Sequence, residues 1–140
     1  KNDFDFIIID CPPSLDLLTV NAFTASDKVL VPIQCEFYAL EGLGQLMNTV
    51  KLIKMRLNPS LEIDGVVCTM YDSRTNLSQQ VVDEVKKYFA KKVYNTFIPR
   101  NVRLAEAPSF GEPIQIFDGY CQGALAYKSL CEEFIERNQG

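Results

Sequence analysis

The sequence predicts an α/β fold in which a mostly parallel sheet is flanked by helices. Short apolar runs, typical of strands buried on both faces, alternate with longer segments in which apolar residues recur at three- and four-residue spacing. This alternation is typical of parallel sheets with right-handed crossovers. The length of 140 residues suits one domain, and the composition, with 47% hydrophobic and 23% charged residues, excludes a disordered chain.

The first strand is expected over residues 4–9, because this run is almost wholly apolar and rich in isoleucine. It ends where two consecutive prolines, at 12 and 13, cannot continue a ladder. Ser14 is expected to cap a helix that runs to about Ala25, and a second apolar strand is expected over residues 28–33.

The later elements follow the same alternation. A long amphipathic helix is expected over residues 39–57, a strand over 63–71, a helix over 76–91 and a fourth strand over 93–98. Residues 104–121 show little periodicity, so we expect an ordered loop there, followed by a closing helix that contains Ala124, Tyr127, Cys131 and Phe134. The Gly42-Leu43-Gly44 triplet lies inside the long helix and indicates close helix packing.

Composition excludes several classes of site. The five cysteines form no C-x-x-C pair and the chain has no histidine, which argues against a zinc site, a disulfide framework and a histidine general base. Any catalysis must therefore use carboxylates, Lys, Arg, backbone amides or a bound ion. No apolar run approaches the roughly 18 residues that span a bilayer, and we expect a cytoplasmic protein without a membrane partner.

The net charge of −4 hides an asymmetry along the chain. Residues 1–50 sum to −5, residues 51–103 to +5 and residues 104–140 to −4. A basic middle segment between acidic ends is a candidate surface for an anionic partner.

The run Phe6-Ile7-Ile8-Ile9-Asp10 joins four apolar residues to a carboxylate. A carboxylate at the carboxyl end of a strand faces the ligand crevice, and Mg²⁺ accepts one or two carboxylates while keeping most of its waters. The alternative is a solvated aspartate that ends a strand.

Residues 5–15, Asp-Phe-Ile-Ile-Ile-Asp-Cys-Pro-Pro-Ser-Leu, resemble the Walker B and switch II segment of the ParA/MinD family of deviant-Walker P-loop ATPases. Three further strings, at residues 32–43, 69–77 and 98–109, resemble the chromosomal ParA branch, often called Soj. Members of this family begin with a loop of the type K-G-G-x-G-K-[ST], and these 140 residues contain no Gly-Lys pair. The resemblance therefore implies that residues 1–140 are the C-terminal portion of a ParA-type ATPase domain. This portion starts at the Walker B strand and has a partial P-loop NTPase fold that lacks the P-loop strand.

The resemblance also implies roles for single residues. Asp10 would be catalytic and hold magnesium through water, and Pro12 would belong to the switch that senses the γ-phosphate of ATP. The adenine would lie against Met70, Pro99, Asn101 and Val102, since a flat base needs apolar faces and a polar edge partner. The alternative for Met70 is core packing.

Arg74 and Arg103 correspond to arginines with which the Soj branch contacts DNA without sequence preference. Both fall in the basic segment, together with Lys86, Lys87, Lys91, Lys92 and Arg100. The alternative is a solvated helix face on which Lys86 and Lys87 pair with Asp83 and Glu84.

The implied function is that of a DNA-segregation ATPase for chromosome or plasmid partitioning. Its ATP-dependent homodimer, or another homo-oligomer, would bind nonspecific DNA, associate with the nucleoid and be stimulated by a ParB-like protein. Without the P-loop, the chain alone would bind ATP weakly or not at all and would not hydrolyse it. The missing strand would also leave two apolar edges, at residues 4–9 and 28–33, which must pair with each other or with another chain.

Two alternatives remain open. One is a non-catalytic interaction or dimerisation module. The other is a MinD-like regulator of the cell-division site, which the acidic residues 131–140 disfavour, because membrane-binding helices of that kind have basic flanks.

Overall fold

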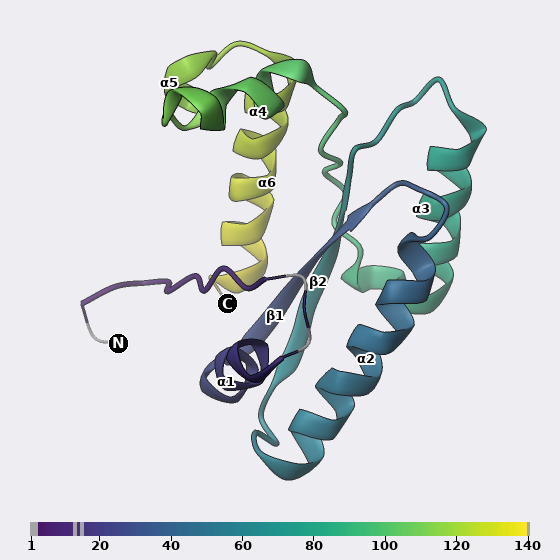
Figure 1. The fold of residues 1–140 in the computed structure, drawn as a ribbon, viewed down its shortest axis with the longest axis vertical. Coiled ribbons are helices and arrows are strands. Elements are labelled where there is room, and N and C mark those ends of the chain that lie inside the picture. Colours follow the sequence, from purple (N-terminus) through teal and green to yellow (C-terminus); the bar gives the residue numbers. More distant parts are fainter. Residues whose placement is uncertain (1–2, 13, 15, 140) are drawn as a thin grey trace.

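A computed structural model describes residues 3–12, 14 and 16–139 (Figure 1). The elements in chain order are α1 (Leu17–Ala25), β1 (Lys28–Gln34), α2 (Ala39–Arg56), β2 (Glu62–Thr69), α3 (Asn76–Phe89), the 3-10 turn η1 (Ala90–Lys92), α4 (Val102–Glu106), the 3-10 turn η2 (Ala107–Phe110), α5 (Ile114–Phe117) and α6 (Gln122–Asn138). The α/β class with a parallel strand pair and flanking helices is confirmed.

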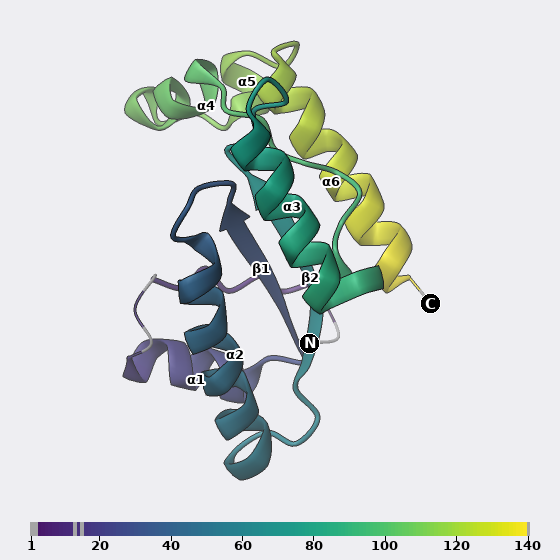
Figure 2. The same cartoon turned by 90° about the vertical axis from the view of Figure 1, so that its right-hand side faces the viewer.

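The two strands run parallel, with Val31 opposite Val66 and Gln34 opposite Thr69. Helices α2 and α3 lie on one side of the strands and α6 on the other (Figures 1 and 2). The β2 side chains alternate accordingly: Val66 packs with α2 and α3, whereas Val67 packs with Tyr94 and α6. A strand covered on both sides explains the continuous buried run over residues 65–68.

Strand β1 is covered on one side only. Its buried residues Val29, Val31 and Ile33 alternate with exposed ones, and Leu30 keeps 37% of its surface exposed. The prediction of an apolar strand at residues 28–33 is confirmed, but its second face is not part of the core.

The first predicted strand is wrong. Residues 4–9 have no strand assignment and, within the described chain, no backbone hydrogen bond joins them to β1 or β2. Ile7 and Ile8 are 63% and 84% exposed, so this apolar run lacks the neighbours that a buried strand requires. The two edges expected to pair with each other therefore do not.

The fourth predicted strand, at residues 93–98, is replaced by an extended segment with two isolated parallel bridges, Val66 to Val93 and Tyr71 to Pro99. Between these bridges the N–H groups of Asn95 and Thr96 donate to the carboxylate of Glu133 on α6. The ladder is interrupted because Glu133 takes the N–H of Thr96, so that Ile98 and not Thr96 donates to the carbonyl of Cys68.

Three smaller expectations also need correction. Asp16, not Ser14, caps α1, because its carboxylate accepts from the N–H groups of Leu18 and Thr19. The ordered loop expected at residues 104–121 contains most of α4, η2 and α5. A Cβ at Gly42 or Gly44 would meet nothing within 4 Å, so the triplet is not a close packing site.

Over the part of the chain that the structure describes, no helix combines the length and apolar character needed to cross a membrane.

Candidate functional site

The loops that follow β1 and β2 meet at one end of the molecule, the upper end in Figures 1 and 2. The N–H of Tyr71 donates to the carbonyl of Ile98 and the N–H of Arg100 donates to the carbonyl of Tyr71, both at 3.0 Å. This pairing places Tyr71 between Ile98 and Arg100, with Met70 one residue before the bridge and Asn101 two residues after it. Met70 directly follows β2, whereas Pro99 and Asn101 follow an extended segment joined to it by an isolated bridge and not a strand.

Met70 and Pro99 supply half-buried apolar surface at this end. Met70 adopts a positive φ of 53°, which is costly for a residue with a side chain, and it belongs to none of the buried clusters in the described residues. Met70 is thus half-buried without belonging to a core cluster of the described residues. Val102 is 71% exposed, so it leaves a further apolar side chain open to a ligand.

Asn101 caps α4 with its side-chain oxygen. Its Oδ1 accepts from the N–H groups of Arg103 and Leu104 at 2.9 and 3.4 Å. Within the described chain its amide Nδ2 donates to no protein group, so this donor remains available. Asn101 can hold the helix and bind the edge of a base at the same time.

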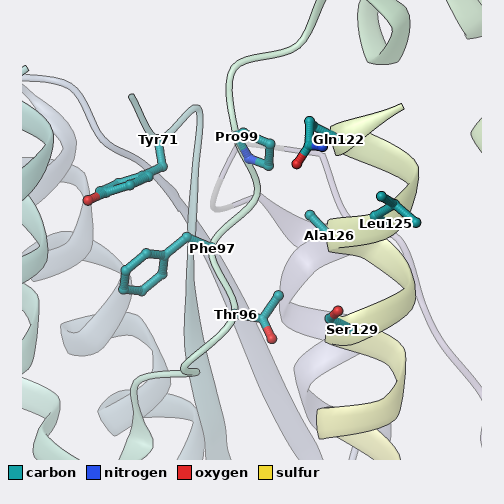
Figure 3. Close-up of a pocket in the computed structure, with 8 residues that line it drawn as sticks. All are labelled: Tyr71, Thr96, Phe97, Pro99, Gln122, Leu125, Ala126 and Ser129. Carbon is teal, nitrogen blue, oxygen red and sulfur yellow. The ribbon is translucent and has the colours of Figure 1, made fainter. Parts of the chain in front are cut away.

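Pro99 also borders a pocket of about 520 Å³ between residues 96–99 and α6. In Figure 3, Pro99 and Thr96 lie across from Gln122, Ala126 and Ser129 of α6. This pocket is largely open to solvent, and apolar and polar side chains both line it.

The predicted magnesium and switch residues are not assembled with this base site. Asp10 and Pro12 are exposed or nearly so, and the N-terminal segment crosses below the upper ends of the strands in both views (Figures 1 and 2). Among the described residues no three His, Cys, Asp or Glu side chains converge on one point. Apolar surface and an amide donor of the kind that a flat base needs are therefore present at this end, and the assignment of Asp10 to magnesium through water stays a prediction.

Arg74 is held by a neighbouring carboxylate. Its Nε and Nη2 donate to the two oxygens of Asp72 at 2.9 and 2.8 Å, and its backbone N–H donates to the same side chain at 3.0 Å. The guanidinium lowers the pKa of Asp72 to about 2, and the carboxylate raises the pKa of Arg74. Both groups stay charged at every ordinary pH.

Arg103 is also paired. Its Nη1 donates to Glu106 at 3.0 Å, and its Nε lies 3.2 Å from an oxygen of Asp118. The hydrogen bond with Glu106 raises the pKa of Arg103, and the charges of Glu106 and Asp118 add to the effect. Arg100 pairs with Glu36 at 2.9 Å, so all three arginines at this end have carboxylate partners.

The lysines of α3 behave differently from one another. Lys87 forms an ion pair with Glu84, which confirms the helix-face alternative for this residue. The ammonium of Lys86 lies 5.8 Å from the centre of the Phe97 ring, and Asp83 accepts a hydrogen bond from Gln79.

Sequence reasoning missed Asp72 and Glu133. The Asp-x-Arg spacing before the cap residue Thr75 is a local signal for the first of these, because an aspartate can accept from the backbone two residues on. Glu133 lies 37 residues from Thr96, so no local pattern could have found it.

A family model described as "AAA domain" matches residues 1–63. The chain is 62% identical to the sporulation initiation inhibitor protein Soj of Bacillus subtilis, over 95% of this chain and 53% of that protein. It is 56% identical to the chromosome partitioning protein ParA of Caulobacter vibrioides, over 97% of this chain and 51% of that protein. The chain thus spans about half the length of the curated relatives that it matches.

Two solved structures are similar in fold. Cobyrinic acid a,c-diamide synthase from Mycobacterium smegmatis, solved with bound ADP and magnesium, has a TM-score of 0.72 and 37% identity over 93% of this chain and 46% of that one. The cell division ATPase MinD of Pyrococcus furiosus also has a TM-score of 0.72, with 26% identity over 97% of this chain and 54% of that one.

Proposed function

Because this chain belongs to the ParA/Soj family over the half of those proteins that it spans, we propose that it is the C-terminal portion of a DNA-segregation ATPase. The observation that carries the proposal is the pairing of Tyr71 with Pro99, which joins the chain after Met70 to the chain before Asn101, at the end that also carries Arg74 and Arg103. The proposed adenine site and the proposed DNA-binding arginines then belong to the same end of the molecule.

The base of ATP is held by apolar contact with Met70, Pro99 and Val102. The amide of Asn101 donates a hydrogen bond to a ring nitrogen, which selects a base with an acceptor on that edge. Its side-chain oxygen keeps the first turn of α4 in place, so binding of the base orients the helix that carries Arg103.

Arg74 and Arg103 bind phosphates of duplex DNA without reading the sequence. In the proposed cycle ATP closes a homodimer, the dimer binds nonspecific DNA on the nucleoid, and a ParB-like protein stimulates hydrolysis. We assign Asp10 to a magnesium ion through water and Pro12 to the γ-phosphate switch, on the resemblance of residues 5–15 alone. No step of phosphoryl transfer is assigned to residues of this structure.

A MinD-like role is a second candidate, favoured by the similar fold of the Pyrococcus furiosus protein. The higher identity to Soj and ParA and the acidic residues 131–140 favour DNA over a membrane.

The test uses the natural protein that carries this sequence. Its affinity for a mixed-sequence DNA duplex is measured by fluorescence anisotropy, with and without ATP and at several salt concentrations. We expect binding that requires ATP, falls with salt and weakens at least tenfold in Arg103→Glu. Lys51→Glu, at an exposed lysine on the far half of α2, is the matched charge-reversal control.

Three other outcomes would contradict the proposal. Unchanged DNA binding in Arg103→Glu would remove this residue from the interface. ATP-dependent binding to anionic phospholipid vesicles in place of DNA would favour the MinD-like role. Self-association without any ATP binding would favour a non-catalytic module.

A further inference from the structure

The two arginines proposed to bind DNA are already bound by carboxylates of the same chain. Arg74 is 86% exposed, so a phosphate could reach it, yet two of its guanidinium nitrogens are used by Asp72. A guanidinium presents a planar fork that fits one carboxylate or one phosphate at a time on a given edge. Asp72 thus occupies the edge that a DNA phosphate would use.

The carboxylate of Asp72 is held in place by a second interaction. Its Oδ1 accepts the backbone N–H of Arg74 at 3.0 Å, and its side chain is only 20% exposed. The competing anion is therefore preorganised and pays little conformational entropy to hold the arginine. Arg103 has a comparable arrangement, with Glu106 one turn away on the chain and Asp118 beyond the end of α5.

We infer that Asp72 is an intramolecular competitor for DNA phosphate at Arg74, with Glu106 and Asp118 acting in the same way at Arg103. The inference rests on the proposed DNA binding and concerns its regulation. A phosphate that uses the paired edge must displace the carboxylate, so each arginine adds less to the affinity than one with all its edges open would. The carboxylate also pairs with the arginine again when DNA dissociates, which keeps the protein–DNA complex weak and exchangeable.

Asp72→Asn separates this role from a structural one. Asparagine keeps an oxygen that accepts the N–H of Arg74, so the turn before α3 is retained, while the charge that pairs with the guanidinium is lost. In the variant, DNA no longer has to break this ion pair to reach Arg74. The free energy of one exposed ion pair corresponds to a gain in DNA affinity of about 3-fold.

The control is Asp83→Asn, which removes one negative charge from an exposed position on α3 whose partner is Gln79 and not an arginine. It reports the effect of net charge alone. Arg74→Ala and the double variant Asp72→Asn/Arg74→Ala complete a cycle that isolates the coupling between the two residues.

Affinity of the natural protein for a mixed-sequence duplex is measured with ATP at one low salt concentration. We expect Asp72→Asn to bind about 3-fold more tightly than the wild type. We expect a smaller gain for Asp83→Asn, and no gain from Asp72→Asn in the Arg74→Ala background.

Two results overturn the inference while leaving the proposed function intact. In the first, Arg74→Ala weakens DNA binding, but the affinity of Asp72→Asn rises no more than that of Asp83→Asn. In the second, Asp72→Asn binds DNA more weakly than the wild type, because the carboxylate orients Arg74 for DNA. If the wild type binds no DNA with ATP, the proposed function fails, and the inference fails with it.

Discussion

Glu133 holds Thr96 by two hydrogen bonds: its Oε2 accepts from the backbone N–H at 2.9 Å and from the hydroxyl at 2.8 Å. Its other oxygen accepts from the backbone of Asn95 at 2.8 Å and from Arg137 at 2.6 Å. One side chain of α6 therefore replaces a stretch of ladder, and fixes the segment that leads to Pro99 and Asn101.

Replacing Glu133 with Gln should lower the free energy of unfolding by about 2 kcal/mol at pH 7, because charge-assisted hydrogen bonds to Asn95, Thr96 and Arg137 are lost. Burial raises the pKa of Glu133, but these hydrogen bonds outweigh it and leave the pKa below its usual value. A lowered carboxyl pKa contributes stability that is full above the unfolded pKa of about 4.3 and is lost as the pH falls through the folded pKa.

The difference between wild type and Glu133→Gln should therefore shrink below about pH 4, as urea denaturation at a series of pH values would show. Glu132→Gln, at the exposed neighbouring position, is the control and should change little. A constant difference from pH 7 to pH 3 would contradict the assignment.

Two glycines should respond in opposite directions to alanine. A Cβ at Gly65 would lie 2.5 Å from Cε2 of Tyr94 and 2.6 Å from the carbonyl oxygen of Lys92, one of which is backbone. We expect Gly65→Ala to destabilise the fold by about 2 kcal/mol or more, through overpacking of β2 against the residue 92–94 segment. Gly44→Ala, in open space within α2, should stabilise it by about 1 kcal/mol.

Thermal or urea unfolding of the two variants tests this pair in one experiment. A stabilising effect at Gly65 would show that the extended segment is not packed against β2 as described. A loss of stability in Gly44→Ala would indicate that Gly44 is closely packed, as the sequence predicted.

Asn101→Asp should weaken binding of an adenine nucleotide about tenfold while leaving α4 capped. Aspartate caps helices as well as asparagine does, but it lacks the amide donor proposed to bind the base. Titration of the natural protein with a fluorescent ATP analogue measures the effect, and circular dichroism checks that the helix content is kept. An unchanged affinity would remove Asn101 from the base site.

The sequence predicted elements whose pattern is local. Helices α2 and α3 and strand β2 were located correctly because their apolar spacing alone determines which face is buried. The run at residues 4–9 has an equally clear pattern, but a strand also needs partners that no local pattern supplies.

The candidate site also has a part that could be predicted from the sequence and a part that could not. The expectation that Met70 and Pro99 lie near each other comes from the resemblance of residues 69–77 and 98–109 to the ParA branch, and the bridge between Tyr71 and Pro99 puts both at one end of the molecule. The partners of the arginines depend on side chains such as Asp118 that lie in irregular segments, and the sequence gives no spacing rule for them. Long-range polar contacts are therefore the part that the structure adds.

The 140-residue chain by itself should release no phosphate from ATP above background. Phosphoryl transfer depends on backbone amides, a lysine and a metal ion placed around the phosphates of ATP. The 140 residues contain no Gly-Lys pair of the kind that binds these phosphates. In addition, Asp10 is exposed, and the N-terminal segment that carries it lies apart from the ends of the strands (Figure 1). A steady-state phosphate-release assay with ATP and magnesium, run beside the natural protein, measures this. Turnover by the chain alone would mean that its own residues position the phosphates, and would require a second catalytic carboxylate or lysine among them.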